Sequence, residues 1–325
     1  MNRASILGVF ALLAAAGFVL AEKDSQFGVP VRIVPGVWFV EGDEANTGHC
    51  NNIIIEMKDY LIMVDANFPS GARLAQAAAR QVSRKPVKYV FDTHHHGDHS
   101  SGNTVWTAAG ATTFAHVGVT EEMIRAGTQN WRNNPRKDIA ELKRDTPEPP
   151  MQTFRTSPYV IEDSSRRVEF HHFGWAHTRG DGLVYLPKEK VLCSGDVVVN
   201  GAFNATGNAN LGNWPTVIAA AQKLDVAYVL PGHGRPGGKD LMSGQSLFLI
   251  ELQKGVKASI QQGKKLEDLV TMKDGKPASS NLELPETVKN WSGGEFYGAQ
   301  VRDAYEELTQ GKPRGDIALG NRPRN

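Results

Sequence analysis

The sequence predicts an α/β fold with a mostly helical C-terminal extension. The chain opens with short apolar runs separated by turn signals, continues with strands that alternate with Ala-rich helical segments, and returns to closely spaced strands in its second half. Its 325 residues are 40% hydrophobic and 22% charged, which is an ordinary globular composition. This length suits one large domain followed by a tail.

Four strands are expected to open the fold as a β-meander. The apolar runs come in two pairs, at residues 31–34, 37–40, 52–56 and 60–64. Pro35-Gly36 separates the first pair and Lys58-Asp59 the second, and such residues are typical of turns between paired strands. Asp65 follows the last run, where its carboxylate either supports a metal ligand or caps a helix N-terminus or stabilises a turn.

The middle of the chain alternates helices with strands. Apolar residues at helical spacing predict a helix over residues 71–83, and apolar, β-branched and aromatic residues predict a strand over 88–91. A second helix is expected over 100–110 and a further strand over 112–115. Residues 127–158 carry a charged helical patch and a Pro-rich end, so we expect an insertion that is either a flap over the site or a solvated excursion.

The second half repeats the strand-rich pattern. Strands are expected at residues 159–161, 168–172, 182–186, 191–194 and 225–230. A Gly- and Asn-rich loop over 200–213 and a helix over 215–224 precede the last strand. Residues 241–325 are expected to be mostly helical and to end in a Gly-, Pro- and Arg-rich tail over 311–325. These helices either pack on the core or mediate dimerisation.

Residues 1–21 have the features of a secretory signal peptide: an early Arg3, an apolar run over 6–20 and the small residue Ala21 before charged residues. The apolar run, about fifteen residues, is shorter than the roughly twenty that a membrane-spanning helix needs. We therefore expect cleavage after Ala21, a periplasmic or secreted product and no stable membrane insertion. The net charge of +1 creates no field that would attract nucleic acid.

The chain has two cysteines, Cys50 and Cys193. An oxidising compartment would permit a disulfide between them. Cys193 lies inside an apolar run and Cys50 just before one, so two separate buried thiols are an equally good interpretation.

The segment from Thr93 to His99 holds the densest set of metal-ligand side chains. It follows a predicted strand and has the pattern His-x-His-x-Asp-His, formed by His94, His96, Asp98 and His99. Imidazole and carboxylate groups are ligands for a borderline metal such as zinc, and α/β sheets place their sites at strand exits. A metal site predicts further ligands at the ends of other strands, whereas an exposed histidine-rich loop predicts none.

Three distant residues meet this expectation, because His177, Asp196 and His233 each follow a predicted strand. Each alone would be interpreted as structural or solvated. Together with the histidine-rich segment they favour a metal centre. We expect His95 to be structural, since it points away from the ligands if His94 and His96 both face a metal.

These motifs resemble those of the metallo-β-lactamase superfamily. The chain contains in order His-x-His-x-Asp-His, Gly-x-x-His-Thr-x-Gly-Asp (174–181), Ser-Gly-Asp (194–196) and Pro-Gly-His-Gly (231–234). The resemblance covers about residues 30–240, and we expect a catalytic domain over 22–240. It implies an αββα sandwich with metal ions at one edge between two sheets, and a small-molecule substrate. It also implies two zinc ions, with iron or manganese as alternatives.

The resemblance assigns one ion to His94, His96 and His177 and the other to Asp98, His99 and His233, with Asp196 bridging. Three neutral imidazoles leave an ion its double charge, whereas two carboxylates balance more of the charge of the second ion. Two ions about 3.5–4 Å apart can share a hydroxide whose pKa falls from 15.7 towards ~7. We expect this hydroxide to attack an ester, lactone or amide bond, with Asp98 as the catalytic residue that orients or deprotonates the water. Three further residues either fix imidazole tautomers or stabilise loops, namely Thr93, Thr178 and Asp181.

Two departures bear on the substrate. Asp196 stands where many β-lactamases of the superfamily have Cys or Ser, and Val199 stands where some have Lys. These residues disfavour a dedicated β-lactamase, and export disfavours a thioesterase. The alternatives are an iron-dependent oxidoreductase resembling persulfide dioxygenases and a non-catalytic periplasmic binding or maturation protein. We expect selectivity to come from residues 41–50, 127–158 and 200–213.

Overall fold

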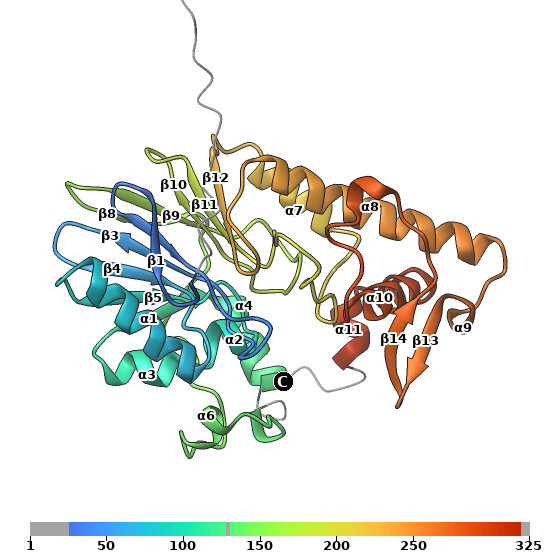
Figure 1. The fold of residues 1–325 in the computed structure, drawn as a ribbon, viewed down its shortest axis with the longest axis horizontal. Coiled ribbons are helices and arrows are strands. Elements are labelled where there is room, and N and C mark those ends of the chain that lie inside the picture. Colours follow the sequence, from blue (N-terminus) through green and yellow to red (C-terminus); the bar gives the residue numbers. More distant parts are fainter. Residues whose placement is uncertain (1–25, 128–130, 320–325) are drawn as a thin grey trace, which may run out of the picture.

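The computed structural model describes residues 26–127 and 131–319, and its first sheet has seven strands (Figure 1). In spatial order they are β1 (Pro30–Val34), β2 (Val37–Val40), β3 (Asn52–Glu56), β4 (Leu61–Val64), β5 (Val87–Phe91), β6 (Thr112–His116) and β7 (Gln152–Phe154). The pairs from β1 to β4 are antiparallel, which confirms the predicted meander. The pairs from β4 to β7 are parallel, as the alternation with helices requires.

The second sheet has five strands. In spatial order they are β12 (Tyr228–Pro231), β11 (Val191–Gly195), β10 (Leu183–Leu186), β9 (Arg167–His171) and β8 (Tyr159–Glu162). The strands from β8 to β11 pair antiparallel, and β12 joins β11 in parallel. All five coincide with the predicted strands to within a few residues.

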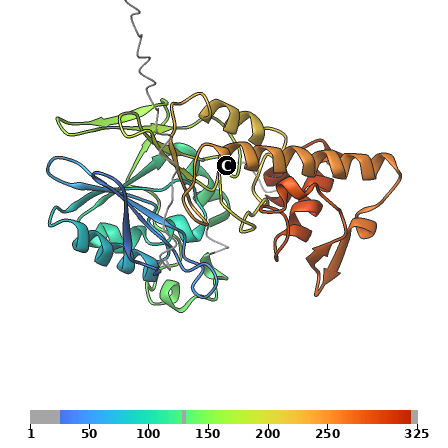
Figure 2. The same ribbon diagram turned by 45° about the horizontal axis from the view of Figure 1, so that its top comes forward.

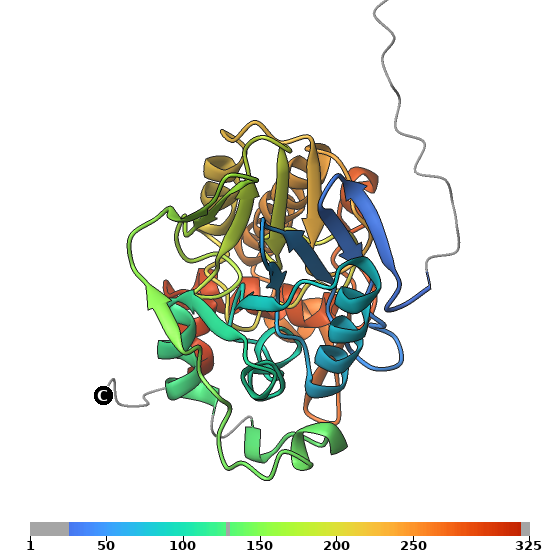
Figure 3. The ribbon, with the colours of Figure 1, turned by 90° about the vertical axis from the view of Figure 1, so that its left-hand side faces the viewer.

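Three apolar clusters separate four layers. The first lies between the sheets and includes Phe91 from one and Phe170 from the other. The second packs the outer face of the first sheet against Ala72 of α1 (Pro69–Val82) and Trp106 of α3 (Asn103–Ala108). The third packs the second sheet against α7 (Trp214–Ala221) and α8 (Asp240–Gln261). The molecule is therefore the αββα sandwich that the resemblance implied, and Figure 3 views its two sheets from the side.

The C-terminal extension packs on the core through α8, whose Met242 and Leu249 belong to the same cluster as Ile218 of α7. It continues with α9 (Leu266–Leu269), β13 (Val270–Lys273), β14 (Lys276–Ser280), the 3-10 helix η2 (Glu286–Val288), α10 (Tyr297–Gln310) and α11 (Arg314–Leu319). Figures 1 and 2 both place the β13–β14 hairpin at the end of the molecule away from the two sheets.

Two parts of the extension differ from the prediction. The β13–β14 hairpin was expected to be helical, although Asp274 and Gly275 both have positive φ and form the two-residue turn that such hairpins favour. Its strands are largely exposed, so they lack the alternation that predicts a strand. The expected tail contains α11, because Gly311 ends α10 in the left-handed conformation and the chain starts a new helix at Arg314.

The segment over 127–158 is only partly an excursion. Residues 128–130 lie outside the described residues, but α6 (Lys137–Ala140) falls in the predicted charged helical patch and β7 completes the first sheet. Asp138 of α6 accepts hydrogen bonds from the backbone and hydroxyl of Ser70, so this segment is fastened to the start of α1. Upstream of it, α4 (Val117–Glu122) and the π-helix η1 (Met123–Gly127) follow β6 without having been predicted.

The expected signal peptide over residues 1–21 lies outside the described residues. Within the described part of the chain, none of the helices has the length and apolar character needed to cross a bilayer.

Candidate metal centre

All seven predicted ligands meet at one edge of the two sheets. His94 and His96 lie in the loop after β5, and Asp98 and His99 lie on the short helix α2 (Gly97–Ser100) that follows. The other three come from the second half of the chain, after β9, β11 and β12, and are His177, Asp196 and His233. The segments that follow four strands therefore converge, as a metal site built on an α/β sheet requires.

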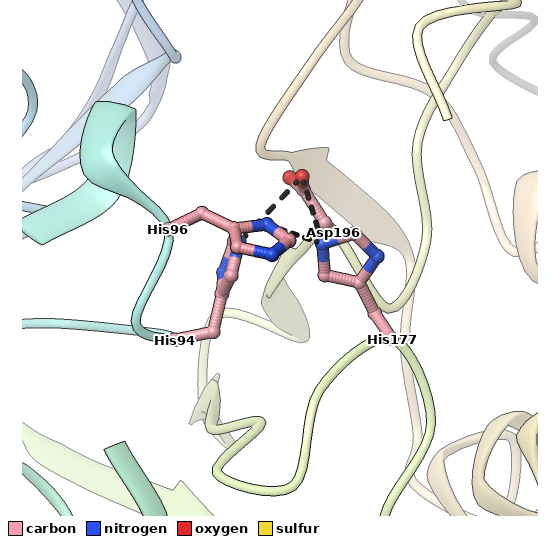
Figure 4. Close-up of side chains that lie close together, drawn as sticks. All are labelled: His94, His96, His177 and Asp196. Atoms are coloured by element: carbon pink, nitrogen blue, oxygen red, sulfur yellow. Dashed lines mark hydrogen bonds and ion pairs between the residues drawn. The ribbon is translucent and has the colours of Figure 1, made fainter. Parts of the chain in front are cut away.

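Three imidazoles face Asp196 from one side (Figure 4). We call His94, His96 and His177 the histidine group; the ligand atoms of these residues and Asp196 all lie within 4.8 Å of one another. His96 Nδ1 is 3.0 Å from His177 Nε2. Asp196 Oδ2 is 3.5 Å from His177 Nε2 and 3.8 Å from His94 Nε2.

A second set of ligand atoms also lies close to Asp196. We call Asp98, His99 and His233 the mixed group, and their ligand atoms are also within 4.8 Å of one another. Asp98 Oδ2 is 3.0 Å from His233 Nε2 and 3.3 Å from His99 Nε2. Asp196 Oδ1 is 3.4 Å from His99 Nε2, and its Oδ2 is 3.6 Å from His233 Nε2. Asp196 is thus within reach of both groups.

The hydrogen bonds of the histidines leave the inward nitrogens free to bind a metal. His99 Nδ1–H donates to Asp65 Oδ2 at 2.9 Å, which leaves the lone pair on Nε2. Thr93 Oγ1 is 3.1 Å from His94 Nδ1 and holds that ring in place, although a hydroxyl can either donate to or accept from this nitrogen. His94 Nε2 and Asp196 Oδ1 are buried without a hydrogen-bond partner. Imidazole nitrogens and carboxylate oxygens presented in this way fit zinc.

The two polar residues expected near His177 act on its backbone. The carboxylate of Asp181 accepts from the hydroxyl of Thr178 at 2.6 Å, from the Thr178 N–H at 2.9 Å and from the Ala176 N–H at 3.2 Å. They therefore stabilise the loop that carries His177, which is the second of the two interpretations offered by the sequence. For Thr93 and Asp65, in contrast, the structure favours support of a ligand.

Three contacts of the site were not identified from the sequence. Asn208 Oδ1 accepts a hydrogen bond from His96 Nε2–H at 2.9 Å. Glu44 Oε1 lies 3.3 Å from His233 Nδ1. The Phe203 ring packs against the His233 ring, with 4.2 Å between the ring centroids. All three lie in loops expected to carry selectivity, but no local pattern distinguishes an Asn, Glu or Phe that reaches a site from one that does not.

The two groups differ in electrostatics. Burial lowers the pKa of His94 and His177 well below the usual value, and neighbouring imidazoles add to the effect, so both rings are neutral. Burial also opposes the charged form of His233, but Asp196 and Asp98 outweigh it and raise its pKa to about 10. His99 and His233 hold the pKa of Asp98 well below its usual range. The carboxylates of Asp98 and Asp196 thus stabilise positive charge in the mixed group, whether a proton on an imidazole or a bound cation carries it.

The motif Pro-Gly-His-Gly requires glycine at Gly232. A Cβ atom there would lie 2.2 Å from Asp196 Oδ1 and 3.0 Å from His99 Cε1. The backbone before His233 therefore approaches Asp196 and His99 more closely than a side chain at this position allows.

His95 and the two cysteines lie outside both groups. The His95 ring is 4.8 Å from that of His96, and its structural role stays a prediction. Cys50 and Cys193 are buried free thiols, which confirms the second interpretation of the cysteines. Burial raises the pKa of both thiols, so neither is an activated nucleophile.

The fold and these two groups define a metal-binding protein with an αββα sandwich. The family model of the metallo-beta-lactamase superfamily matches residues 45–233. The chain belongs to this superfamily of metal-dependent hydrolases.

Named relatives are distant. A metallo-beta-lactamase type 2 of Bacillus sp. (strain 170) is 24% identical over 200 residues, which cover 59% of this chain and 69% of the relative. The corresponding protein of Bacteroides fragilis is 27% identical over 123 residues, covering 36% of this chain and 48% of the relative.

Solved structures show the same fold. The metallo-beta-lactamase from Pontibacter korlensis aligns with a TM-score of 0.55 at 22% identity and covers 68% of this chain and 97% of its own. The DIM-1 metallo-beta-lactamase aligns with a TM-score of 0.55 at 18% identity, and the alignment covers 68% of this chain and 96% of DIM-1. At such identities the likeness concerns the fold alone.

Proposed function

We propose that the protein is a two-zinc hydrolase that cleaves an ester, lactone or amide bond of a small-molecule substrate. The observation that carries this proposal is the arrangement of six ligand-type side chains in two groups of three, both of which lie close to a seventh, Asp196. The histidine group would hold one ion and the mixed group the other, and the oxygens of Asp196 would be shared. Bound zinc supplies a nucleophilic water at neutral pH and polarises a carbonyl oxygen.

Asp98 is the carboxylate best placed to act on substrate and water. Its side chain is 17% exposed, against 8% for Asp196. The two imidazoles beside Oδ2 hold Asp98 ionised, so it can accept a hydrogen bond from the attacking water and orient it. We therefore propose Asp98 as the catalytic residue.

The surroundings of Val199 support an ester or lactone over a dedicated β-lactam substrate. Val199 is 1% exposed and belongs to the apolar cluster beneath α7 and α8. This position therefore offers no cation to a substrate carboxylate. β-Lactams, which are cyclic amides, nevertheless belong in any substrate panel, because the relatives are named as metallo-beta-lactamases.

We further propose that the protein is exported, as the features of residues 1–21 indicate, and that it works in the periplasm or outside the cell. In this proposal residues 22–240 form the catalytic domain and residues 241–325 the extension.

The proposal is tested on the purified protein by metal analysis followed by hydrolysis of ester, lactone, β-lactam and phosphoester substrates. We expect two zinc ions per chain, loss of hydrolysis on chelation and recovery on addition of zinc. Hydrolysis that survives thorough chelation would contradict the proposal. One iron per chain with oxygen consumption would favour the oxidoreductase, and a metal-loaded protein inert on the whole panel would favour a binding function.

A further inference from the structure

The loop over residues 200–213 is held by the C-terminal extension at several points. Thr206 Oγ1 donates to Asp303 Oδ2 of α10 at 2.6 Å, and Gln300 Nε2 of α10 donates to Asn204 O at 2.7 Å. Glu307 of α10 accepts from the backbone N–H groups of Leu211 at 3.1 Å and Gly212 at 2.7 Å. The loop before α7 is therefore built against α10, which Figure 1 shows beside α11 in red.

The centre of this contact is a buried carboxylate. Asp303 is 0% exposed and is paired with the guanidinium groups of Arg302 and Arg314 as well as with Thr206. A buried charge with this many partners holds one geometry, because loss of any partner leaves the charge insufficiently solvated. Asp303 thus fixes the position of Thr206 and of the loop around it.

The helix α11 packs directly on the backbone of Asn208. Gly315 N–H donates to the carbonyl of Ala209 at 2.9 Å, and a Cβ atom at Gly315 would lie 2.6 Å from the carbonyl oxygen of Asn208. That oxygen also accepts from Trp175 Nε1–H at 2.9 Å. The backbone of Asn208 is therefore held between Trp175, on the loop that leads to His177, and the extension.

The side chain of Asn208 faces the histidine group. Its Oδ1 accepts from His96 Nε2–H at 2.9 Å, which puts the proton of His96 on Nε2 and leaves the lone pair on Nδ1. Nδ1 is the atom that lies 3.0 Å from His177 Nε2, inside the histidine group. Asn208 therefore selects the tautomer and ring orientation of His96 that a metal needs.

We propose that the C-terminal extension sets the metal affinity of the histidine group through Asn208, which is a positioning residue for His96. The inference rests on the proposed function, since it requires that the histidine group binds zinc. It adds that residues of α10 and α11, outside the part of the chain matched by the family model, strengthen that binding.

The direct test compares Asn208→Ala with Asn208→Asp in the full chain. The dissociation constant of each zinc ion is measured by competition with a chromophoric chelator, and bound Co²⁺ is followed by its absorption spectrum. We expect Asn208→Ala to lower the affinity for one of the two zinc ions about 10–100-fold and to leave the affinity for the other unchanged. Asn208→Asp keeps an acceptor for His96 Nε2–H and is expected to restore the affinity and the Co²⁺ spectrum. The control Asn290→Ala removes an exposed hydrogen bond to Asn200 and is expected to change neither.

The remote test compares two substitutions of Thr by Val. Thr206→Val removes the buried hydroxyl bonded to Asp303, whereas Thr309→Val removes an exposed hydroxyl bonded within α10. Of these two variants, we expect only Thr206→Val to lower the affinity for the ion that Asn208→Ala affects. The decrease should be smaller, because other contacts still hold the loop. Wild-type affinity for both ions in Asn208→Ala would overturn the inference while leaving the proposed function intact. A wild-type protein that binds no metal at either group would overturn both.

Discussion

The histidine group and the mixed group share Asp196 but are built differently. The histidine group has the buried imidazoles of His94 and His177 and the half-buried imidazole of His96, and desolvation lowers the pKa of all three. Thr93 and Asn208 hold two of these rings. The mixed group has two imidazoles beside the carboxylate of Asp98, and Asp65 holds His99. Two subsites with different charge therefore lie within one centre, so their ions should differ in affinity and respond to different substitutions.

The largest effect is expected at Asp196, because both groups depend on it. Asp196→Asn removes the negative charge that the two groups share. It should lower the affinity for both ions and the rate of hydrolysis by more than about 100-fold, which is beyond the range found for residues that only support ligands. Zinc stoichiometry and kcat/KM measure the effect. The matched control is Asp225→Asn, an exposed carboxylate paired with Lys190. Loss of only one ion would show that Asp196 belongs to a single group.

Gly232→Ala should affect both groups without removing any ligand. The new Cβ would meet Asp196 Oδ1 at 2.2 Å and His99 Cε1 at 3.0 Å, so these side chains must move. A displacement on the order of 1 Å can cost about 100-fold in rate. Gly255→Ala in α8 is the control, since a Cβ there would make only ordinary contacts of 3.4 to 3.5 Å with Leu282 and Leu284. Equal activity of the two variants would mean that the close approach of Gly232 is not required.

Asp65→Asn should affect metal binding at the mixed group and leave the histidine group unchanged. Asn can still accept from Thr93 N–H, but its amide would donate to His99 Nδ1 and drive the ring proton to Nε2, the nitrogen that faces the mixed group. We expect the affinity of the mixed group for its ion to fall about 10–100-fold and the affinity of the histidine group to stay unchanged. Stepwise zinc titration measures both, with the exposed Asp59→Asn as control. A change at the histidine group would contradict the division proposed here.

The smallest effect concerns a carboxylate outside the centre. Hydrogen bonds from Arg136 and Ser70 outweigh burial and lower the pKa of Asp138 to about 2. Because the folded pKa lies below the unfolded value, this group stabilises the fold above about pH 4, and the contribution disappears as the pH falls towards 2.

Asp138→Asn should therefore lower the free energy of unfolding at pH 7 by about 1 kcal/mol, a value discounted for partial exposure, and by less at pH 3. Urea unfolding at both values measures it. Zinc affinity should not change, and a loss of zinc would place α6 in the support of the metal centre.

The convergence of the candidate ligands could be predicted from the sequence because chemistry and position agreed. His177, Asp196 and His233 are each a ligand type at a strand exit, and β9, β11 and β12 run in the same direction, which brings these exits to one edge. The antiparallel opening and the second sheet could be predicted for a similar reason, since short apolar runs and turn residues are local signals.

The rest depends on contacts between distant segments. Asn208 is one of several Asn residues in a loop, and only the packing of Gly315 and Trp175 selects it to face His96. The β13–β14 hairpin has exposed strands, so its single local signal was the Asp274-Gly275 turn. Neither feature has a hydrophobic period from which it could be recognised.

The most direct test of the account is anomalous X-ray diffraction from the zinc-loaded protein at the zinc absorption edge. We predict two peaks, one bound by His94, His96 and His177 and the other by Asp98, His99 and His233, with Asp196 within bonding distance of at least one. A single peak, or a second peak away from the mixed group, would contradict the two-group centre.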